Sequence, residues 1–294
     1  MCRLVLYLGP PITLASLITD PVNSLIRQSF ASKERVEPLN GDGFGVAWYA
    51  HGLDEDRPAM FKSISPAWNN RNLQDLCRVT QSGCILAHVR AATSAQSVDE
   101  VNCHPFAWKH YAFAHNGDVG GFRKIRRTLL RGLSDDAFNV VRGSTDSEHT
   151  FALWVDHMLK LRAGGAEETA DTMAEAMRRT ISDLVRMGAD AEVDEACYLN
   201  TVVTDGKRAV VTHYSSDPEY IDSLHLHSAK RYTCVAGHTA IIQRGNDAAS
   251  AIVVASEALS NETGWSRIDK NRVVVIDERL GTVMREIRVG EPVA

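Results

Sequence analysis

The second residue of the chain is a cysteine, and its position gives it a chemistry that an internal cysteine lacks. Removal of Met1 is expected before a small residue and would leave Cys2 with a free α-amine. That amine, with a pKa of about 7.7–8.0, can act as a base at neutral pH, whereas a thiol with a pKa of about 8.5 is mostly protonated. Nucleophile and base would then share one residue. Taken alone, such a cysteine is more often simply a residue near a terminus.

Six further short motifs follow Cys2, and their order is more informative than any one of them. They are Asn-Gly-Asp-Gly-Phe-Gly at 40–45, Ala-His-Val-Arg-Ala-Ala-Thr at 87–93, Asn-Cys-His-Pro-Phe at 102–106, His-Asn-Gly at 115–117, Ser-Thr-Asp-Ser-Glu at 144–148 and Val-Ala-Ser-Glu at 254–257. With these motifs the chain resembles the class II glutamine amidotransferases, which are N-terminal-nucleophile hydrolases. The resemblance runs from residue 1 to about residue 277 and implies an α+β fold, a four-layer αββα sandwich.

The resemblance implies a nucleophile and an oxyanion hole. Cys2 would be the nucleophile, with its own α-amine as the base. The side-chain amide of Asn116 and the backbone N–H of Gly117 would hold the oxyanion. An amide suits that task because it is a neutral donor that does not protonate a neighbouring thiolate, and losing such a donor costs hydrolases about 2.7–4 kcal/mol.

The resemblance also implies three residues that bind a glutamyl group. Arg90, helped by Thr93, would hold its α-carboxylate, and Asp146 would hold its α-ammonium. A zwitterion calls for one guanidinium and one carboxylate, and the planar fork of arginine can bind both oxygens of a carboxylate.

Each of these residues also has a purely structural interpretation. Arg90, at a predicted strand end, could form only a salt bridge, and Asp146 could only cap a helix. Asn116 and Gly117 could form only a turn, because Asn-Gly is a frequent turn pair. Cap and turn roles are compatible with ligand contact, so both interpretations stay open for each residue.

A narrower resemblance points to γ-glutamyl hydrolysis. Residues 24–30, 40–49, 66–73, 122–129 and 143–153 resemble the amidotransferase-like subunits of fungal glutathione-degradation complexes. Several of these motifs also occur in the γ-glutamyl hydrolases of the ergothioneine pathway. Both imply cleavage of a γ-glutamyl amide bond, in glutathione or a related thiol compound, through a γ-glutamyl thioester on Cys2, with no metal or organic cofactor. The fungal type also implies a metallopeptidase-like partner subunit, and homo-oligomerisation is left open.

Two alternatives remain at this stage. The chain could be a glutaminase subunit that supplies ammonia from glutamine to a separate synthase. It could also be a catalytically silent regulatory subunit that keeps the pocket. No synthase or phosphosugar-binding segment is recognisable after the last motif, so we do not expect a fused biosynthetic amidotransferase.

Composition limits the other function classes. The chain has 294 residues, 44% of them hydrophobic, and 32 basic against 37 acidic residues, which gives a net charge of −5. This acidic balance argues against a dedicated nucleic-acid binder, and no apolar run reaches the ~20 residues of a membrane helix. We expect one cytoplasmic domain, 1–294. Its six cysteines would be reduced thiols, mostly buried as small hydrophobic residues.

Strand-like and helix-like segments divide the chain unevenly. β-branched apolar runs predict strands at 4–8, 45–49, 85–89, 111–114, 199–204, 209–213, 252–255 and 273–276. Helical periodicity predicts helices at 70–79, 122–133, 147–161 and 168–187, with Asp146 as the N-cap of the third. Strands at both ends and helices in the middle indicate an α+β order.

Three other features receive structural interpretations. The eleven histidines include no paired Cys/His zinc spacing. The basic cluster within 123–131 has interleaved aliphatic residues and indicates a solvated helix face. The glycines at 41, 43 and 45 precede a strand without a phosphate-binding lysine, so they indicate backbone shaping near the pocket.

Overall fold

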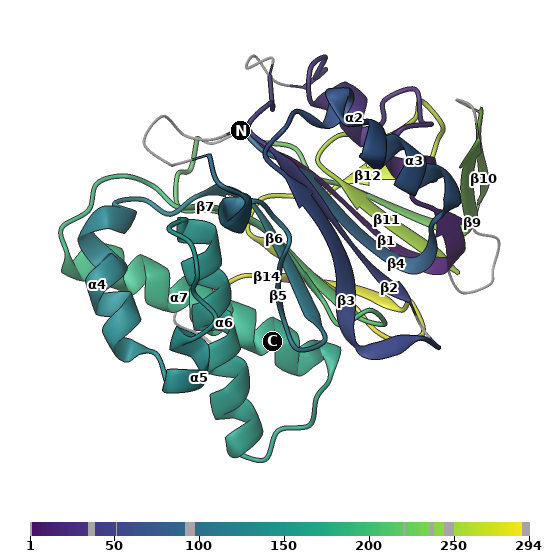
Figure 1. The fold of residues 1–294 in the computed structure, drawn as a ribbon. Coiled ribbons are helices and arrows are strands. Elements are labelled where there is room, and N and C mark those ends of the chain that lie inside the picture. Colours follow the sequence, from purple (N-terminus) through teal and green to yellow (C-terminus); the bar gives the residue numbers. More distant parts are fainter. Residues whose placement is uncertain are drawn as a thin grey trace.

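Two antiparallel sheets form the centre of the computed structural model, which describes residues 2–34, 39–50, 52–91, 98–219, 222–235, 238–243 and 250–289 (Figure 1). The larger sheet has the order β10-β9-β11-β1-β4-β2-β3, with β12 also paired to β9. The smaller sheet has the order β14-β13-β8-β7-β6-β5. The larger sheet contains β1 (Arg3–Thr13), β2 (Phe44–Ala50), β3 (Asp54–Ser63), β4 (Gln81–Val89), β9 (His225–Val235), β10 (His238–Gln243), β11 (Ala251–Ala255) and β12 (Trp265–Arg267). The smaller sheet contains β5 (Phe106–Trp108), β6 (Tyr111–Asp118), β7 (Tyr198–Thr204), β8 (Ala209–Ser215), β13 (Arg272–Ile276) and β14 (Thr282–Glu286).

Helices cover the outer face of each sheet. The helices are α1 (Ala15–Ile18), α2 (Leu25–Gln28), α3 (Arg71–Val79), α4 (Phe122–Gly132), α5 (Asp135–Phe138), α6 (Asp146–Ala163) and α7 (Ala170–Asp190), with short 3₁₀ turns η1 (Ala67–Asn69) and η2 (Glu100–Asn102). One hydrophobic cluster joins α1–α3 to the larger sheet, a second fills the space between the sheets, and a third joins α4–α7 to the smaller sheet. The predicted αββα sandwich is confirmed.

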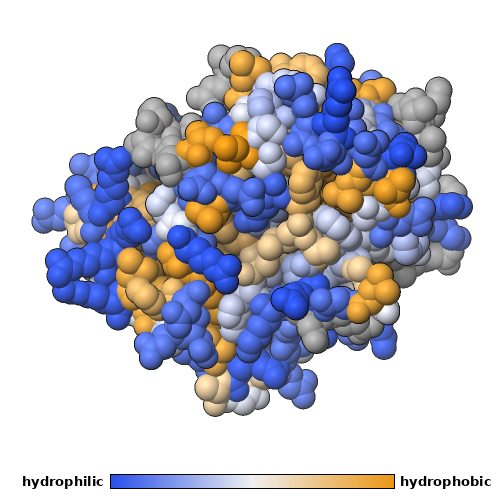
Figure 2. Space-filling view, viewed as in Figure 1, coloured by the Kyte–Doolittle hydropathy of each residue, from blue (hydrophilic) through white to orange (hydrophobic). Residues whose placement is uncertain are grey.

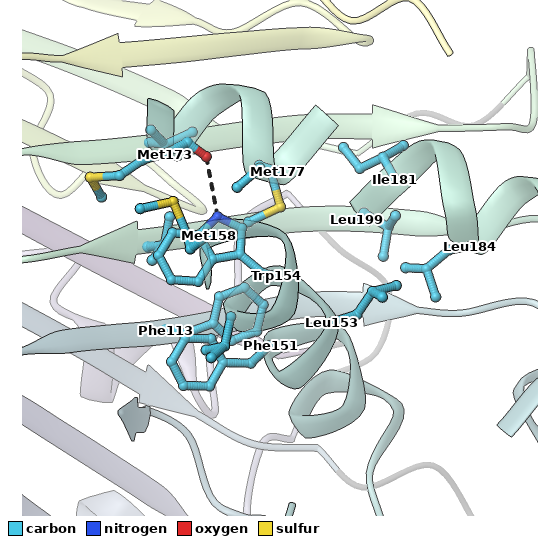
Figure 3. Packing of buried hydrophobic residues seen from close by; sticks show 14 of the residues in the cluster. Phe113, Phe151, Leu153, Trp154, Met158, Met173, Met177, Ile181, Leu184 and Leu199 are labelled. Carbon is cyan, nitrogen blue, oxygen red and sulfur yellow. Dashed lines mark hydrogen bonds between the residues drawn. The ribbon is translucent and has the colours of Figure 1, made fainter. Parts of the chain in front are cut away.

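The core under α6 and α7 is rich in aromatic and methionine side chains (Figure 3). Phe151 stacks on Phe113 of β6, with ring centroids 5.1 Å apart. The buried indole of Trp154 donates its N–H to the carbonyl oxygen of Met173, 3.1 Å away, which joins α6 to α7. This packing fixes the first turn of α6, where Asp146 lies.

The predicted helices form close to their expected bounds, with one correction. The side chain of Asn70 caps α3 by accepting the N–H of Leu73. The N-cap of α6 is Thr145, whose hydroxyl accepts the N–H of Glu148 at 3.2 Å, and Asp146 is the first helical residue. The prediction of Asp146 as N-cap is wrong because the shorter threonine side chain already satisfies that orphan N–H.

The first strand is longer than predicted. β1 continues past Leu8 to Thr13 and includes Pro10 and Pro11. Its pairing with β4 shifts register between Leu8 and Ile12, and its pairing with β11 covers only 5–8. The prolines therefore lie at a bulge with no second partner strand, where missing N–H groups break no ladder.

The cysteines and the basic cluster of α4 lie as the sequence predicts. All six cysteines are free thiols, and all except Cys2 are buried. In α4 the basic side chains are exposed while Ile125 and Leu129 are buried. No helix in the described part of the chain is long and apolar enough to cross a membrane.

Candidate active site

Cys2 lies at the end of the larger sheet where β1 and β4 meet. The ladder pairs Arg3 with Val89, so Cys2 comes next to Arg90 and Ala91. The N–H of Ala91 donates to the Cys2 sulfur at 3.4 Å. Burial raises the pKa of the Cys2 thiol, although this N–H and the charges of Arg90 and Arg3 act in the opposite direction. A thiol with a raised pKa needs a base to become a nucleophile.

Asn116 and Gly117 come from the facing strand of the smaller sheet. β6 contacts both β1 and β4 across the space between the sheets. The side chain of Asn116 is 1% exposed, and neither its amide nitrogen nor its oxygen has a hydrogen-bond partner within the described residues. An unpartnered buried amide is costly unless a ligand or water satisfies it. Gly117 leaves no space for a side chain, because a Cβ there would lie 1.8 Å from the Tyr198 carbonyl oxygen.

His115 positions this end of β6. Its Nε2 lies 2.9 Å from the Tyr198 carbonyl oxygen, which can only accept, so Nε2 carries the proton. Burial lowers the pKa of His115, opposed by the charge of Asp146, and keeps the ring neutral. Its Nδ1 must therefore accept from the hydroxyl of Ser147, 2.9 Å away. Sequence reasoning assigned His115 no role, and only its place beside Asn116 could have drawn attention to it.

Asp146 is held close to the C-terminal end of β6. Its Oδ2 accepts the backbone N–H of Val119 at 2.9 Å, and the residue is 4% exposed. Because the hydroxyl of Ser147 donates to His115, it is turned away from Asp146 Oδ1, which is 3.5 Å distant. The backbone N–H of Val119 thereby helps to orient the carboxylate.

Arg90 is almost fully buried. Its backbone N–H donates to the carbonyl oxygen of Gly43, and its own carbonyl accepts from Asp42. The rings of His88 and His104 lie nearby, tilted to each other, with their centroids 4.2 Å apart. Burial, together with the Arg90 charge, lowers the pKa of His88 to about 3, so this histidine adds no competing positive charge.

The glycines of the 40–45 motif allow close backbone approaches beside Arg90. A Cβ on Gly45 would lie 2.1 Å from the carbonyl oxygen of His104, and Gly43 has a φ of +122°, which an L side chain rarely adopts. The interpretation as backbone shaping is supported by these close approaches. In the same motif Asn40 is 1% exposed, and its amide lacks a hydrogen-bond partner among the described residues.

Sequence reasoning missed a buried ion pair that holds the nucleophile. The Nε of Arg3 lies 3.0 Å from Glu257 Oε1, and one Nη donates to the carbonyl oxygen of Cys2 at 2.9 Å. The other Nη donates to Ser32, whose hydroxyl also donates to Glu257. Arg3 and Glu257 are 254 residues apart in the chain, and their only signals were the place of Arg3 next to Cys2 and that of Glu257 in the 254–257 motif.

We expect Glu257→Gln to lower the free energy of unfolding by about 3–5 kcal/mol, because it removes the carboxylate that is paired with the buried Arg3 guanidinium. Burial alone would raise the pKa of Glu257, but hydrogen bonds from Ser32 and Lys33 and the charge of Arg3 lower it. The pair therefore stabilises the fold above the ordinary glutamate pKa and loses that effect as the pH falls below it. Urea unfolding at pH 7 measures the change.

A matched control is Glu278→Gln, since Glu278 is an exposed glutamate in a weak ion pair with Arg208. Its cost should stay within about 0.5 kcal/mol. Equal losses in the two variants would contradict the role assigned to Glu257.

Asp118, which follows Gly117, gives a prediction about pH. Burial, with the charges of Asp146 and Glu195, raises the pKa of Asp118 from 3.8 to about 6. The folded state therefore binds this proton more tightly than the unfolded state, and this residue's contribution to stability falls as the pH rises from about 4 to about 6. We expect Asp118→Asn to remove this dependence, and to be more stable than the wild type at pH 7.

Urea unfolding at pH 4.5 and pH 7 measures the difference between the two proteins. Asp136→Asn, at an exposed position on α5, is the control and should leave the pH dependence unchanged. An unchanged pH dependence in Asp118→Asn would contradict the raised pKa.

Four of the predicted residues thus lie at neighbouring strand and helix ends, and Gly117 follows one of them directly. The four are Cys2, Arg90, Asn116 and Asp146. Thr93 and Met1 lie outside the described residues, so the predictions made for them cannot be compared with the fold. Among the described residues no three His, Cys, Asp or Glu side chains gather closely enough to hold a metal ion.

This fold and site define the class. The family model of class-II glutamine amidotransferases matches residues 14–290, and the chain belongs to this family. It is accordingly an amide-bond hydrolase by class, and the predicted family is confirmed.

Curated relatives span nearly the whole chain. It is 39% identical over 295 residues to the probable glutamine amidotransferase DUG3 of Saccharomyces cerevisiae, covering 95% of this chain and 82% of that protein. It is 26% identical over 280 residues to the gamma-glutamyl-hercynylcysteine sulfoxide hydrolase of Mycobacterium tuberculosis, covering 95% of this chain and 94% of that protein.

Solved structures share the fold. A glutamine aminotransferase class-II domain protein from Silicibacter pomeroyi matches with a TM-score of 0.65 at 24% identity, covering 98% of this chain and all of that one. The glutamine phosphoribosylpyrophosphate amidotransferase of B. subtilis matches with a TM-score of 0.60 at 14% identity, covering 98% of this chain and 50% of that one.

Proposed function

We propose that this protein hydrolyses a γ-glutamyl amide bond, in glutathione or a related γ-glutamyl thiol compound, and releases glutamate. The observation that carries the proposal is the buried amide of Asn116, which has no partner within the described residues and lies on the strand facing Cys2 and Arg90. A tetrahedral oxyanion would supply the missing acceptor for its N–H. The curated relatives include a named γ-glutamyl hydrolase, which supports this substrate class.

The reaction would proceed in two steps. The Cys2 sulfur attacks the γ-carbonyl carbon while the α-amine takes the thiol proton, and Asn116 and the Gly117 N–H hold the oxyanion. The C–N bond then breaks, the leaving amine takes that proton, and a γ-glutamyl thioester remains on Cys2. Water attacks the thioester, glutamate leaves and the thiol is restored.

Arg90 and Asp146 would bind the two charges of the glutamyl head. Arg90, with Thr93, would hold the α-carboxylate, and Asp146 the α-ammonium. The contact of Asp146 with the backbone N–H of Val119 would hold its carboxylate in place for the ammonium. A metallopeptidase-like partner subunit and a homo-oligomer both stay predictions.

Glutamate release from glutathione and from glutamine, measured in parallel with the purified protein, tests the proposal. We expect a larger kcat/KM for glutathione. Preference for glutamine would instead support the alternative of a subunit that supplies ammonia. The intact mass of the same sample reports whether Met1 has been removed. If Met1 is retained, Cys2 has no free α-amine to act as the base.

A further inference from the structure

A concave site that Cys2 does not line lies between β3, β5 and the start of α6. Its volume is about 890 Å³, within the range of small-molecule sites. None of the six sequence-predicted site residues lines it. Its lining combines apolar groups from β3 and β5 with an excess of cationic side chains.

Three of the four cations that line this cavity have no carboxylate at salt-bridge distance within the described residues. The Lys62 ammonium lies 5.1 Å from the centroid of the Phe106 ring, and the Lys109 ammonium 4.5 Å from the Trp108 ring. Within the described parts of the chain, no carboxylate lies within salt-bridge distance of Lys62, Lys109 or Arg142. Burial lowers the pKa of Lys62, although the charges of Cys103, Glu148 and Glu100 oppose the shift. A partly desolvated ammonium without a hydrogen-bonded counter-charge is unfavourable.

The two carboxylates that line the cavity offset only part of the charge of its four cations. Glu148 accepts the backbone N–H groups of Arg142 and Gly143, at 3.1 and 2.6 Å, so both of its oxygens are engaged. Glu100 is exposed. A fourth cation, Arg57, lines the cavity with only an exposed aspartate 3.5 Å away.

Apolar side chains form the rest of the lining. Phe106 and Trp108 offer aromatic rings, while Met60 and Val101 remain 43% and 42% exposed. β3, β5 and the loop after α5 lie on the near side of Figure 1, and Figure 2 shows hydrophobic and strongly hydrophilic side chains interleaved on this face. Exposed apolar groups beside unpaired cations are typical of a surface that binds a ligand.

We propose that this cavity binds an organic acid with a flat apolar body. Lys62 and Arg142 hold the acid group, and the rings of Phe106 and Trp108 with Met60 hold the body. The acid group supplies a hydrogen-bonded counter-charge to Lys62, and burial of the apolar body adds the hydrophobic contribution. The site is independent of the proposed hydrolysis, since it contains neither Cys2 nor Arg90.

Binding of 8-anilinonaphthalene-1-sulfonate, which is such an acid, tests the proposal by fluorescence titration. We expect Lys62→Met to weaken its Kd at least ~10-fold, which corresponds to ~1.4 kcal/mol. Arg142→Met is a second variant, at an exposed position where the fold should tolerate it. Lys124→Met, on the exposed face of α4, is the matched control and should bind as the wild type does. Trp108→Phe should reduce energy transfer from tryptophan to the bound dye.

Competition separates the acid group from the apolar body. Benzoate in excess should displace the dye, whereas benzylamine, which has the same ring and the opposite charge, should not. The proposal is overturned if the wild type does not bind the dye, if Lys62→Met and Arg142→Met both bind it as tightly as Lys124→Met, or if benzylamine competes as well as benzoate. Circular dichroism of each variant confirms that the fold is retained.

Discussion

Replacing Cys2 with alanine is expected to lower glutamate release by ~10⁴-fold or more while leaving the fold intact. The variant keeps the amide of Asn116 and the charged groups that would bind substrate, but it has no sulfur to form the thioester. Cys2 contributes little to the core, because its contacts are with the backbone of Ala91 and through Arg3. Steady-state assays with the γ-glutamyl substrate measure the loss.

Cys77→Ala is the matched control for this prediction. Cys77 is a buried thiol on α3, in the cluster between the helices and the larger sheet. Its loss should lower stability modestly through the cavity left behind, and leave kcat near the wild-type value. Residual activity of Cys2→Ala above a tenth of the wild type would be incompatible with a cysteine nucleophile at this position.

Asn116→Ala is expected to lower kcat by about 10²–10³, with a much smaller change in KM. The reason is that the amide would donate to an oxyanion present only in the transition state, at a cost of about 2.7–4 kcal/mol when lost. The change should not destabilise the fold strongly, because the amide has no hydrogen bond to lose within the described residues. Stopped assays over a range of substrate concentrations separate kcat from KM.

Asn200→Ala distinguishes this role from a structural one. Asn200 is paired with Asn116 in the ladder between β6 and β7, is equally buried, and donates to Asp222 at 2.6 Å. Its replacement should lower the free energy of unfolding but change kcat far less. If the two variants showed the same changes in KM and in kcat, the loss of activity would reflect general damage to the strand.

Strands were predicted correctly where the sequence has clear runs of β-branched and apolar residues. Buried runs such as 85–89 and 199–204 are β-branched and apolar, and the structure places both in strands. The edge strand β3 was missed, because its first half, Asp-Glu-Asp-Arg-Pro, is charged and lacks alternation. Such a strand is specified by its pairing with β2 rather than by local propensity.

The site was predictable only as a set of residue types. The motif order indicated Cys2, Arg90, Asn116 and Asp146, but the contacts that orient them come from residues distant in the chain. Asp146 is fixed by the backbone of Val119, 27 residues away. No periodicity or spacing encodes such contacts, because they depend on how the two sheets pack.

The most direct test of the central claim is mass spectrometry of the protein quenched with acid during turnover of glutathione. We predict an adduct with the mass of one γ-glutamyl group, located by peptide mapping on Cys2 and absent from Cys2→Ala. An adduct on another residue, or glutamate release that continues in Cys2→Ala with no adduct, would contradict the claim that Cys2 forms a γ-glutamyl thioester.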